Sequence, residues 1–362
     1  MVSKEKLNDM NRCMATLDWP IMGNISYIFF GDFLQFSPVA ARSLINPVTT
    51  SREILANAVM AAIDYIVELT DQKRQTDVKY LELLRNLRNF TPTMKDVQYL
   101  QMNCSMPPIV EQTDKWLFTA EGIVSQNLKR IKWNYRSATA FARYHKLDMY
   151  IIQAIDYIDC EYTIAVEKEL ELQFPEYLQK KLSLVIGMPL VITRNIYKKL
   201  GIVNGTVGNL KAFHQDELGN LEAIEINFPT LNFQAASLER NCLLFSRVKA
   251  EGTIKFGKTR IKYQREQFPV YEGFCLTDYK KQGATVQTHA IMALDGNGMS
   301  SYVKLSRTKT SAQTFIDGEI TLQSLKMSKP SGYEAFRLIV GQKQESFFSL
   351  DDSWFLERGT IT

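Results

Sequence analysis

A short apolar run early in the chain ends abruptly at a glycine and an aspartate. The run covers residues 27–30 (Tyr-Ile-Phe-Phe) and is followed by Gly31, Asp32 and, a little later, Gln35. An apolar run of this length, bounded by a glycine, is typical of a strand that is buried on both faces of a parallel sheet. Ligands of such sheets bind beyond the carboxyl ends of the strands, where Asp32 and Gln35 would lie. The run therefore predicts an α/β fold with a binding site at this turn.

Length and composition limit the class of protein. The 362 residues suffice for two or three domains, and 45% hydrophobic with 23% charged residues is ordinary for a globular protein. The formal net charge of +4 permits a nucleic-acid partner without requiring one. Five scattered cysteines without a CxxC pair, and three isolated histidines, predict neither a disulfide framework nor a metal site. We expect no membrane partner, because the longest apolar stretch, 182–193, is short and interrupted by glycine and proline.

Periodicity and turn residues divide the chain into segments of different character. The expected elements are helices at 4–17, 51–69 and 80–87, a strand at 116–119, a β-rich region at 182–268, and strand–helix alternation at 273–307. A proline-containing loop before the strand at 116 is the expected domain boundary. This order of elements predicts more than one α/β domain, with a β-rich region between parts of the second.

Arg74 is a candidate phosphate ligand. It lies in the segment Lys-Arg-Gln-Thr-Asp. The planar guanidinium of an arginine can grip phosphate oxygens and stabilise the charge that develops in phosphoryl transfer. The alternative is an ordinary surface side chain in a polar turn, because short motif matches often arise by chance.

A polar turn later in the chain is a second candidate for phosphate binding. Thr277, Lys280, Lys281, Gln282 and Gly283 follow an apolar run and precede a predicted helix. A helix start opened by glycine, with Thr and Lys beside it, offers amide donors and positive charge to a phosphate. The phosphate would belong either to a nucleotide or to a DNA backbone.

A basic stretch at residues 122–147 is a candidate surface for nucleic acid. It contains six Lys or Arg residues and no acidic residue, with Trp and Tyr among them, and Lys129, Arg130 and Trp133 are its first candidates. Basic groups that meet phosphates and flat rings that stack on bases suit single-stranded nucleic acid. The alternative is a solvated helix whose aromatic side chains pack inward.

Residues 252–259 match the phosphate-loop pattern GxxxxGK[ST] letter by letter. A working phosphate loop leaves a buried strand and opens a helix, so that amides and helix dipole converge on the phosphate. The residues that follow alternate like an exposed strand, and residues 246–251 are polar. We therefore expect a β-hairpin here and not a phosphate loop.

Five segments, taken in order, resemble superfamily-one DNA helicases of the Pif and RecD type, including the helicase regions of Helitron-like mobile elements. They are GDFLQFSPV, KRQTD, GMPLVITRN with NGTVG, TDYKKQGAT and YVKLSR. The resemblance implies RecA-like (P-loop NTPase) motor domains with parallel sheets, the first incomplete and the second carrying an inserted SH3-like β-barrel. The implied bounds are 1–105 for the first motor domain, 106–182 and 269–345 for the second, 183–268 for the barrel and 346–362 for a tail.

The resemblance also implies a role for each matching residue. The catalytic candidates are Gln35, as a γ-phosphate sensor, and Arg74 and Arg307, as charge stabilisers. The nucleotide-binding candidates are Gly31, Asp32, Gln35, Gln282 and Gly283. The DNA-binding candidates are Thr277, Lys280 and Lys281, where a lysine replaces the family's usual serine, together with Lys129, Arg130 and Trp133.

Two family motifs that bind ATP and Mg²⁺ do not precede GDFLQ in these residues. They are the phosphate loop and an Asp-Glu pair, and the opening Met-Val-Ser resembles the residues that follow that pair. We therefore expect an amino-terminally truncated helicase that does not hydrolyse ATP alone, with a separate chain as a possible source of the missing half. We also expect residues up to about 105 to be poorly ordered in isolation, because the strand at 27–30 would lack neighbours.

The leading hypothesis is the carboxyl-terminal portion of an ATP-dependent 5′-to-3′ DNA helicase, which couples ATP hydrolysis to translocation on single-stranded DNA and to unwinding. The second is a non-catalytic remnant of a mobile-element helicase that binds single-stranded nucleic acid. The third is a degenerate gene copy without a selected function. Salt-dependent DNA binding distinguishes the second from the third. A DNA partner and the absence of a secretory signal favour the nucleus or mitochondrion.

Overall fold

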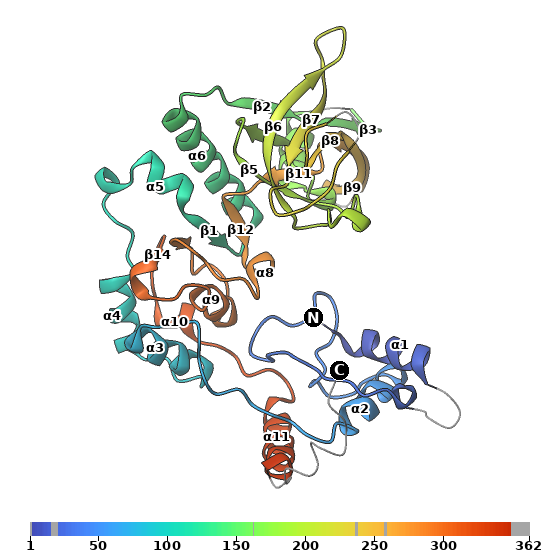
Figure 1. Cartoon of the computed structure of the whole chain (residues 1–362), viewed down its shortest axis with the longest axis vertical. Coiled ribbons are helices and arrows are strands. Elements are labelled where there is room, and N and C mark those ends of the chain that lie inside the picture. Colours follow the sequence, from blue (N-terminus) through green and yellow to red (C-terminus); the bar gives the residue numbers. More distant parts are fainter. Residues whose placement is uncertain (1, 16–20, 162, 236–237, 257–258, 349–362) are drawn as a thin grey trace. The chain divides into compact units, whose positions relative to one another are not determined.

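The computed structural model describes the chain except for residues 1, 16–20, 162, 236–237, 257–258 and 349–362 (Figure 1). The chain divides into two compact units. The first comprises Met1–Gln98, Gly296–Thr310 and Thr321–Thr362, and the second comprises Tyr99–Asp295 and Ser311–Ile320. The YVKLSR segment thus groups with the first unit, whereas the resemblance assigned it to the second motor domain. The finer domain bounds remain predictions.

The first unit is helical in its described residues. Its elements are α1 (Lys4–Met14), η1 (Met22–Asn24), η2 (Ser51–Glu53), α2 (Ile54–Ala61), α3 (Val78–Arg88), α9 (Gly298–Leu305), α10 (Leu322–Leu325) and α11 (Tyr333–Phe348). Helix α4 (Met94–Asn103) begins in this unit and ends in the second. Side-chain caps begin several of these helices. Ser3 accepts a hydrogen bond from the Lys6 amide at the start of α1, and Asp77 accepts one from the Tyr80 amide at the start of α3. The expected helix at 80–87 is confirmed within α3. The helix expected at 4–17 is confirmed as far as Met14, where α1 ends, and residues 16 and 17 lie outside the described residues.

The strand expected at residues 27–30 is wrong. Tyr27 and Phe29 pack on a small apolar cluster beside α1 and α2, whereas Ile28 and Phe30 are 79% and 88% exposed. No strand occurs in the described part of this unit, so residues 27–30 have no neighbouring strand there. The helix expected at 51–69 is also shorter than predicted, since α2 ends at Ala61 and the apolar residues after it are not helical.

A four-stranded parallel sheet forms one part of the second unit. Its strands lie in the order β12 (Cys275–Thr277), β1 (Glu121–Val124), β13 (Ala290–Met292) and β14 (Thr314–Ile316). The helices of this unit are α5 (Asp114–Thr119), α6 (Asn127–His145), α7 (Ile164–Leu172) and α8 (Asp278–Lys281), with the short turns η3 (Ile109–Glu111), η4 (Pro175–Tyr177), η5 (Lys198–Leu200) and η6 (Ser311–Gln313). The predicted α/β class with a parallel sheet is confirmed.

The strand expected at 116–119 is wrong, because these residues lie in α5. The Thr113 side chain accepts a hydrogen bond from the Trp116 amide and so caps a helix. The strand of this region, β1, begins just after that helix. An apolar run this short does not distinguish a strand from a helix by its periodicity.

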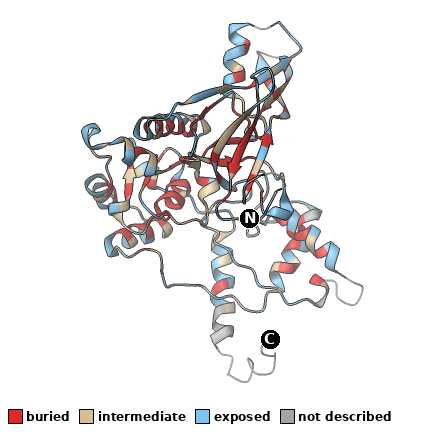
Figure 2. Ribbon diagram, turned by 45° about the horizontal axis from the view of Figure 1, so that its top comes forward, coloured by how far each residue is buried: buried red, intermediate tan, exposed pale blue. Residues whose placement is uncertain are grey.

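Antiparallel strands form the rest of the second unit. One sheet has the order β11 (Val270–Glu272), β5 (Pro189–Ile192), β6 (Val207–Gln215), β7 (Leu221–Asn227) and β8 (Cys242–Ser246). Another has the order β3 (Ile155–Ile158), β10 (Thr259–Gln267) and β9 (Val248–Phe256), and β2 (Tyr150–Gln153) pairs with β4 (Lys181–Leu184). Buried residues gather in these strands and on one side of the adjoining helices (Figure 2). The β-rich region is confirmed, and its SH3-like topology remains a prediction.

Gly122 lets α6 approach the parallel sheet closely. A Cβ atom at Gly122 would lie 2.6 Å from the Cys275 Cβ on β12 and 2.8 Å from the Trp133 ring on α6. We expect Gly122→Ala to lower the free energy of unfolding by about 1–3 kcal/mol, because the added methyl overpacks a filled site. Urea denaturation measures the change. Gly341→Ala is the matched control, since a Cβ there meets no atom within 4 Å, and an equal loss in both variants would contradict the prediction.

Candidate nucleotide and nucleic-acid site

Asp32 organises the GDFLQ loop of the first unit. Its Oδ1 accepts a hydrogen bond from the Leu34 amide at 3.0 Å, and its Oδ2 accepts one from Nε2 of Gln35 at 3.2 Å. Arg88, the last residue of α3, donates from Nη1 to the same Oδ2 at 2.7 Å. Burial would lower the pKa of Arg88, but its hydrogen bond and charge interaction with Asp32 outweigh burial and raise it. The carboxylate therefore holds both the loop and the Gln35 side chain in place.

The KRQ segment is joined to the YVKLSR segment inside this unit. Arg74 donates from Nη1 to the carbonyl of Ser306 at 2.8 Å. Gln75 donates from Nε2 to the carbonyls of Ser306, at 3.2 Å, and of Thr308, at 3.3 Å. The surface alternative for Arg74 is not what the structure shows, because the side chain is half-buried and bonded to a distant backbone segment.

Arg307 lies beside this junction. It is only 2% exposed, and it donates from Nε to the Val303 carbonyl at 2.8 Å and from Nη2 to the Ser306 hydroxyl at 2.7 Å. Burial and, after it, the charge of Arg74 lower the pKa of Arg307 to about 10. The negative charge of Asp32 acts in the opposite direction and raises the pKa of Arg307. The half-buried Arg74 and the buried Arg307 thus place two positive charges near each other, and a polyanion such as a triphosphate would offset both.

The structure thus brings together the candidates Asp32, Gln35, Arg74 and Arg307. Gly31 is exposed, and a Cβ there would touch nothing within 4 Å, so the structure gives no steric reason for this glycine. Arg88 was missed by the sequence analysis, since nothing in its helix resembles a motif. Arg88 is the last residue of α3, and only folding brings it to Asp32, so no pattern in the sequence marks it.

The TDYKKQGAT turn belongs to the second unit and lies at the carboxyl edge of its parallel sheet. Thr277 ends β12 and precedes the short helix α8, whose Asp278 accepts a hydrogen bond from Oγ of Ser125 at 2.8 Å. Ser125 directly follows β1, and its amide donates to Oδ1 of Asp295, beyond the end of β13, at 3.2 Å. This is the edge at which ligands of parallel sheets bind. Ser125 and Asp295 were not predicted.

The two lysines of this turn already have partners within the second unit. Lys280 donates to the Asn204 side chain and lies over the Tyr177 ring, 5.6 Å from its centroid, and burial lowers its pKa. Lys281 pairs with Glu121. Gly283 has a φ of +85° and open space around its Cα, while Gln282 forms the end of α8. The backbone after Gln282 can therefore approach a ligand closely, as a phosphate-binding turn requires.

The basic stretch is helix α6, and two of its three candidates face inward. Arg130 is buried with its guanidinium 4.2 Å from the centroid of the Tyr271 ring, and burial lowers its pKa. Trp133 is 8% exposed and packs in the core beside the parallel sheet. Burial leaves no free ring face for a base, so the predicted DNA-contacting roles of Arg130 and Trp133 do not fit this structure. Lys129 is half-exposed and pairs with Asp295 at 3.3 Å, at the sheet edge.

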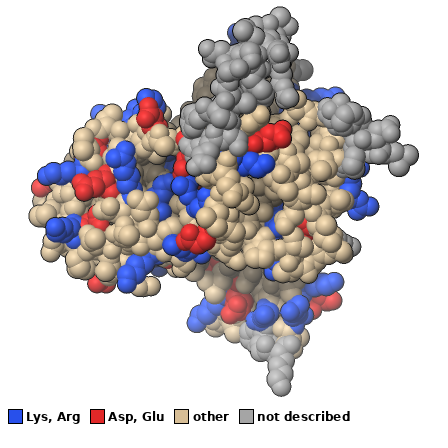
Figure 3. Space-filling view, turned by 90° about the horizontal axis from the view of Figure 1, so that it is seen from below, with Lys and Arg blue, Asp and Glu red and all other residues tan. Residues whose placement is uncertain are grey.

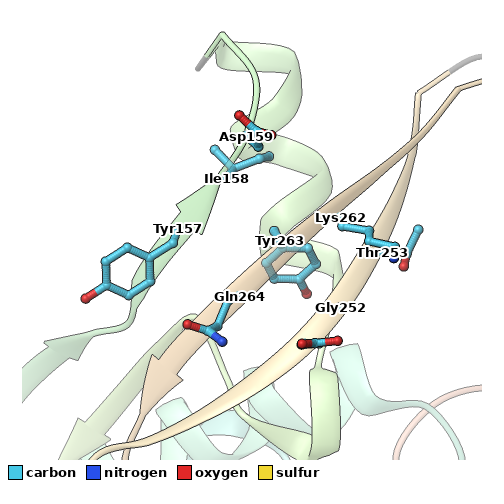
Figure 4. A pocket seen from close by; sticks show the side chains of 9 residues that line it. Tyr157, Ile158, Asp159, Gly252, Thr253, Lys262, Tyr263 and Gln264 are labelled. Atoms are coloured by element: carbon cyan, nitrogen blue, oxygen red, sulfur yellow. The ribbon is translucent and has the colours of Figure 1, made fainter.

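The expected hairpin at residues 252–259 is confirmed by strands β9 and β10. Gly252 pairs with Tyr263 and Thr253 pairs with Lys262 in an antiparallel ladder, so a strand follows where a phosphate loop would need a helix. Gly257 and Lys258 lie outside the described residues. An open hollow of about 510 Å³ borders the two strands (Figure 4), and none of the catalytic or nucleotide-binding candidates lines it.

The distribution of charged side chains and of potential metal ligands bears on the candidate site. Figure 3 shows Lys and Arg side chains interspersed with Asp and Glu on the face in view. Within the described ranges, no group of three or more His, Cys, Asp or Glu residues could hold a metal ion. No helix in the same ranges combines the length and the hydropathy needed to span a bilayer.

Comparisons with known proteins support the resemblance to Pif-type helicases. No family model matches the chain. The chain is 23% identical over 306 residues to "ATP-dependent DNA helicase PIF1" of Xenopus laevis, covering 84% of this chain and 42% of that protein. It therefore spans well under half of the curated relative that it matches.

Solved structures show the same likeness at the level of fold. The Pif1 helicase from Candida albicans superposes with a TM-score of 0.63 at 17% identity, covering 94% of this chain and 74% of that one. The Pif1 helicase from Bacteroides in complex with ADP-AlF3 and ssDNA superposes with a TM-score of 0.60 at 20% identity, covering 94% and 73%. The chain accordingly has the fold of Pif1 helicases and resembles the Pif type of superfamily-one helicases.

Proposed function

We propose that this chain is part of an ATP-dependent DNA helicase motor of the Pif type, with single-stranded DNA and ATP as its partners. The observation that carries the proposal is the junction of Arg74 and Arg307 at Ser306, with Asp32 and Gln35 in the same unit. These are the side chains that would meet the γ-phosphate and stabilise its charge during transfer. Translocation in the 5′-to-3′ direction and a nuclear or mitochondrial location belong to this proposal.

ATP hydrolysis would need two further elements. A phosphate loop would cradle the β- and γ-phosphates, and an acidic pair would hold Mg²⁺. Neither is found ahead of GDFLQ, and the hairpin of β9 and β10 does not replace the loop. Because the chain covers 42% of the curated relative that it matches, we propose that polypeptide outside these 362 residues supplies both. On this proposal the described chain contributes the arginines, Gln35 and the turn at Thr277.

Binding of single-stranded DNA by the chain tests the proposal directly. A fluorescently labelled oligothymidine should bind with an affinity that falls as salt rises, by a slope of about −0.7 for each phosphate neutralised. The variant carrying both Lys280→Ala and Lys281→Ala should bind more weakly and show a shallower slope, by about 1–2. Fluorescence anisotropy measures both the affinity and the slope over about 50 to 200 mM salt.

The control is Lys168→Ala, an exposed lysine of α7. It should leave affinity and slope unchanged, because α7 packs against β9 in the β-rich part of the unit and carries none of the candidate residues. Binding that does not respond to the two lysines at the turn would exclude this turn as the DNA contact. No binding at low salt would remove DNA as a partner of the chain by itself.

Hydrolysis is tested in a fused motor, in which residues 1–362 follow the phosphate-loop and Asp-Glu segment of a Pif1 helicase. The proposal expects this fusion to hydrolyse ATP and to be stimulated by single-stranded DNA, whereas the chain alone should not hydrolyse ATP. A soluble, folded fusion without activity would count against the proposal.

A further inference from the structure

Helix α11 contacts three separate segments of the first unit. The ring of Phe336 meets that of Phe33 edge-to-face, with centroids 4.7 Å apart. Nη1 of Arg337 lies 2.7 Å from Oε2 of Glu68. The ring of Tyr333 meets that of Phe90 edge-to-face at 5.7 Å. Three neighbouring side chains at the start and first turns of one helix therefore reach three loops that are far apart in sequence.

Each of these loops contains or adjoins a residue of the candidate site. Phe33 lies between Asp32 and Gln35 in the GDFLQ loop, and Phe90 closely follows Arg88, the partner of Asp32. Glu68 lies in the segment that leads to Arg74. The helix thus contacts every described segment that enters the polar cluster from the amino-terminal part of the chain.

Neither the GDFLQ loop nor the segment before Arg74 has a helix or strand of its own. Residues 25–50 and 63–77 contain neither element in the described structure, so no ladder of backbone hydrogen bonds holds them. Segments of this kind open at low free-energy cost unless side-chain contacts restrain them. Asp32 restrains its loop from within, and α11 restrains it from outside.

The start of α11 is itself fixed against this region. Gly332, with a φ of +81°, precedes the helix, and a Cβ there would collide with the carbonyl of Ile45, downstream of the GDFLQ loop. Only glycine permits both the left-handed backbone and this close approach. Val340 is buried further along the helix, while Leu338 is 72% exposed. The contacts therefore come from one part of the helix surface and leave another part open.

We propose that α11 is a positioning helix for the phosphate-facing cluster, with Phe336 setting the place of Gln35 through Phe33, and Arg337 setting the approach of Arg74 through Glu68. The catalytic part of this inference rests on the proposed function. The part that concerns how α11 restrains the loops does not. Phe336 is assigned no part in the chemistry, and its effect would reach Gln35 through the ring of Phe33. None of the five motif segments of the sequence extends to α11.

Hydrogen exchange on the unmodified chain and its variants tests this proposal without requiring activity. Phe336→Ala should raise exchange at the Leu34 and Gln35 amides by about ten-fold, because those amides bond to Asp32 within the loop that Phe336 restrains. Phe336→Tyr, which keeps the ring, should restore protection. Leu338→Ala, on the exposed side of the helix, should leave exchange unchanged.

Arg337→Gln provides a second variant whose folding is not at risk, because both partners of its ion pair are partly exposed. It should raise exchange in peptides that cover residues 66–75 and leave the β-rich second unit unchanged. Exchange at the wild-type level in both loops, or a uniform increase over the whole first unit, would overturn the proposal.

The fused motor gives the catalytic readout. Phe336→Ala should lower kcat for ATP by about ten-fold while KM changes less than two-fold, since a misplaced Gln35 acts on the transition state more than on ground-state binding. If the wild-type fusion is inactive, the proposed function fails and hydrogen exchange still decides the role of α11. If the wild-type fusion is active and Phe336→Ala lowers neither kcat nor loop protection, the positioning role fails alone.

Discussion

Arg307→Ala should lower the kcat for ATP hydrolysis of the fused motor by about 10³-fold, the lower end of the range for an arginine that stabilises a transferring phosphoryl group. The guanidinium is buried beside Arg74, and although burial lowers its pKa to about 10, it is still protonated at neutral pH. A charged group held in a water-poor site has more effect on a developing charge than the same group in water. Steady-state ATPase assays at saturating single-stranded DNA measure the loss.

Arg307→Lys separates charge from shape at this position, and a second variant, elsewhere in the chain, serves as a control. Arg307→Lys keeps the positive charge but removes the planar fork, so it should recover only part of the lost rate. Arg143→Ala removes an exposed arginine of α6 that pairs with Asp114, and it should leave kcat unchanged. If Arg307→Ala lowered the melting temperature strongly and Arg307→Lys restored both stability and rate fully, the residue would be structural rather than catalytic.

Asp156→Ala should lower the free energy of unfolding by about 3–5 kcal/mol, because it leaves a buried arginine without its partner. Arg265 on β10 is fully buried, and it donates from Nε and Nη2 to the two carboxylate oxygens of Asp156 at 2.7 and 3.0 Å. Lys180 lies 2.8 Å from the same carboxylate. The remaining guanidinium hydrogen bonds go to backbone carbonyls, which cannot replace the negative charge. Urea denaturation followed by circular dichroism measures the loss.

The same carboxylate predicts how stability depends on pH. Burial would raise the pKa of Asp156, but its hydrogen bonds with Arg265 and Lys180 outweigh burial and lower it below the ordinary value. The stabilisation is therefore complete above the unfolded-state pKa of about 3.9 and is lost as the pH falls through the lower folded-state pKa. Asp156→Asn should lack this acid-dependent part. Asp159→Asn, at an exposed position just beyond the same strand, should keep it, and identical acid profiles for the wild type and Asp156→Asn would refute the assignment.

Local signals in the sequence were sufficient where short-range chemistry decides the structure. Ser3 and Asp77 cap the helices that periodicity predicted, because a capping oxygen and an amphipathic pattern act within one or two turns. The hairpin at Gly252 could be predicted for the same reason, since alternation identifies strands without knowledge of their partners. The GDFLQ, KRQ and LSR segments were recognised together as candidates by their resemblance, in order, to the motifs of a helicase family.

The misses occurred where a segment's structure depends on its neighbours. Residues 27–30 have the composition of a strand, yet a strand exists only where another backbone pairs with it, and the described part of that unit contains no neighbouring strand. Trp133 has a flat ring that could stack on a base. In the folded chain this ring packs in the core beside the parallel sheet, where Gly122 leaves room for it. Neither outcome can be read from a window of residues.

Helix caps and strand alternation follow from the residues themselves, because each depends on covalent neighbours or on a side chain's own chemistry, and the resemblance to a helicase family singled out Arg74 and Arg307 as candidates. Folding alone decides that Arg74 and Arg307 meet at Ser306, that Arg88 holds Asp32, and that α11 reaches the loops around them. These groups are far apart in sequence. They come together only when the whole chain packs, because many native contacts then stabilise one another.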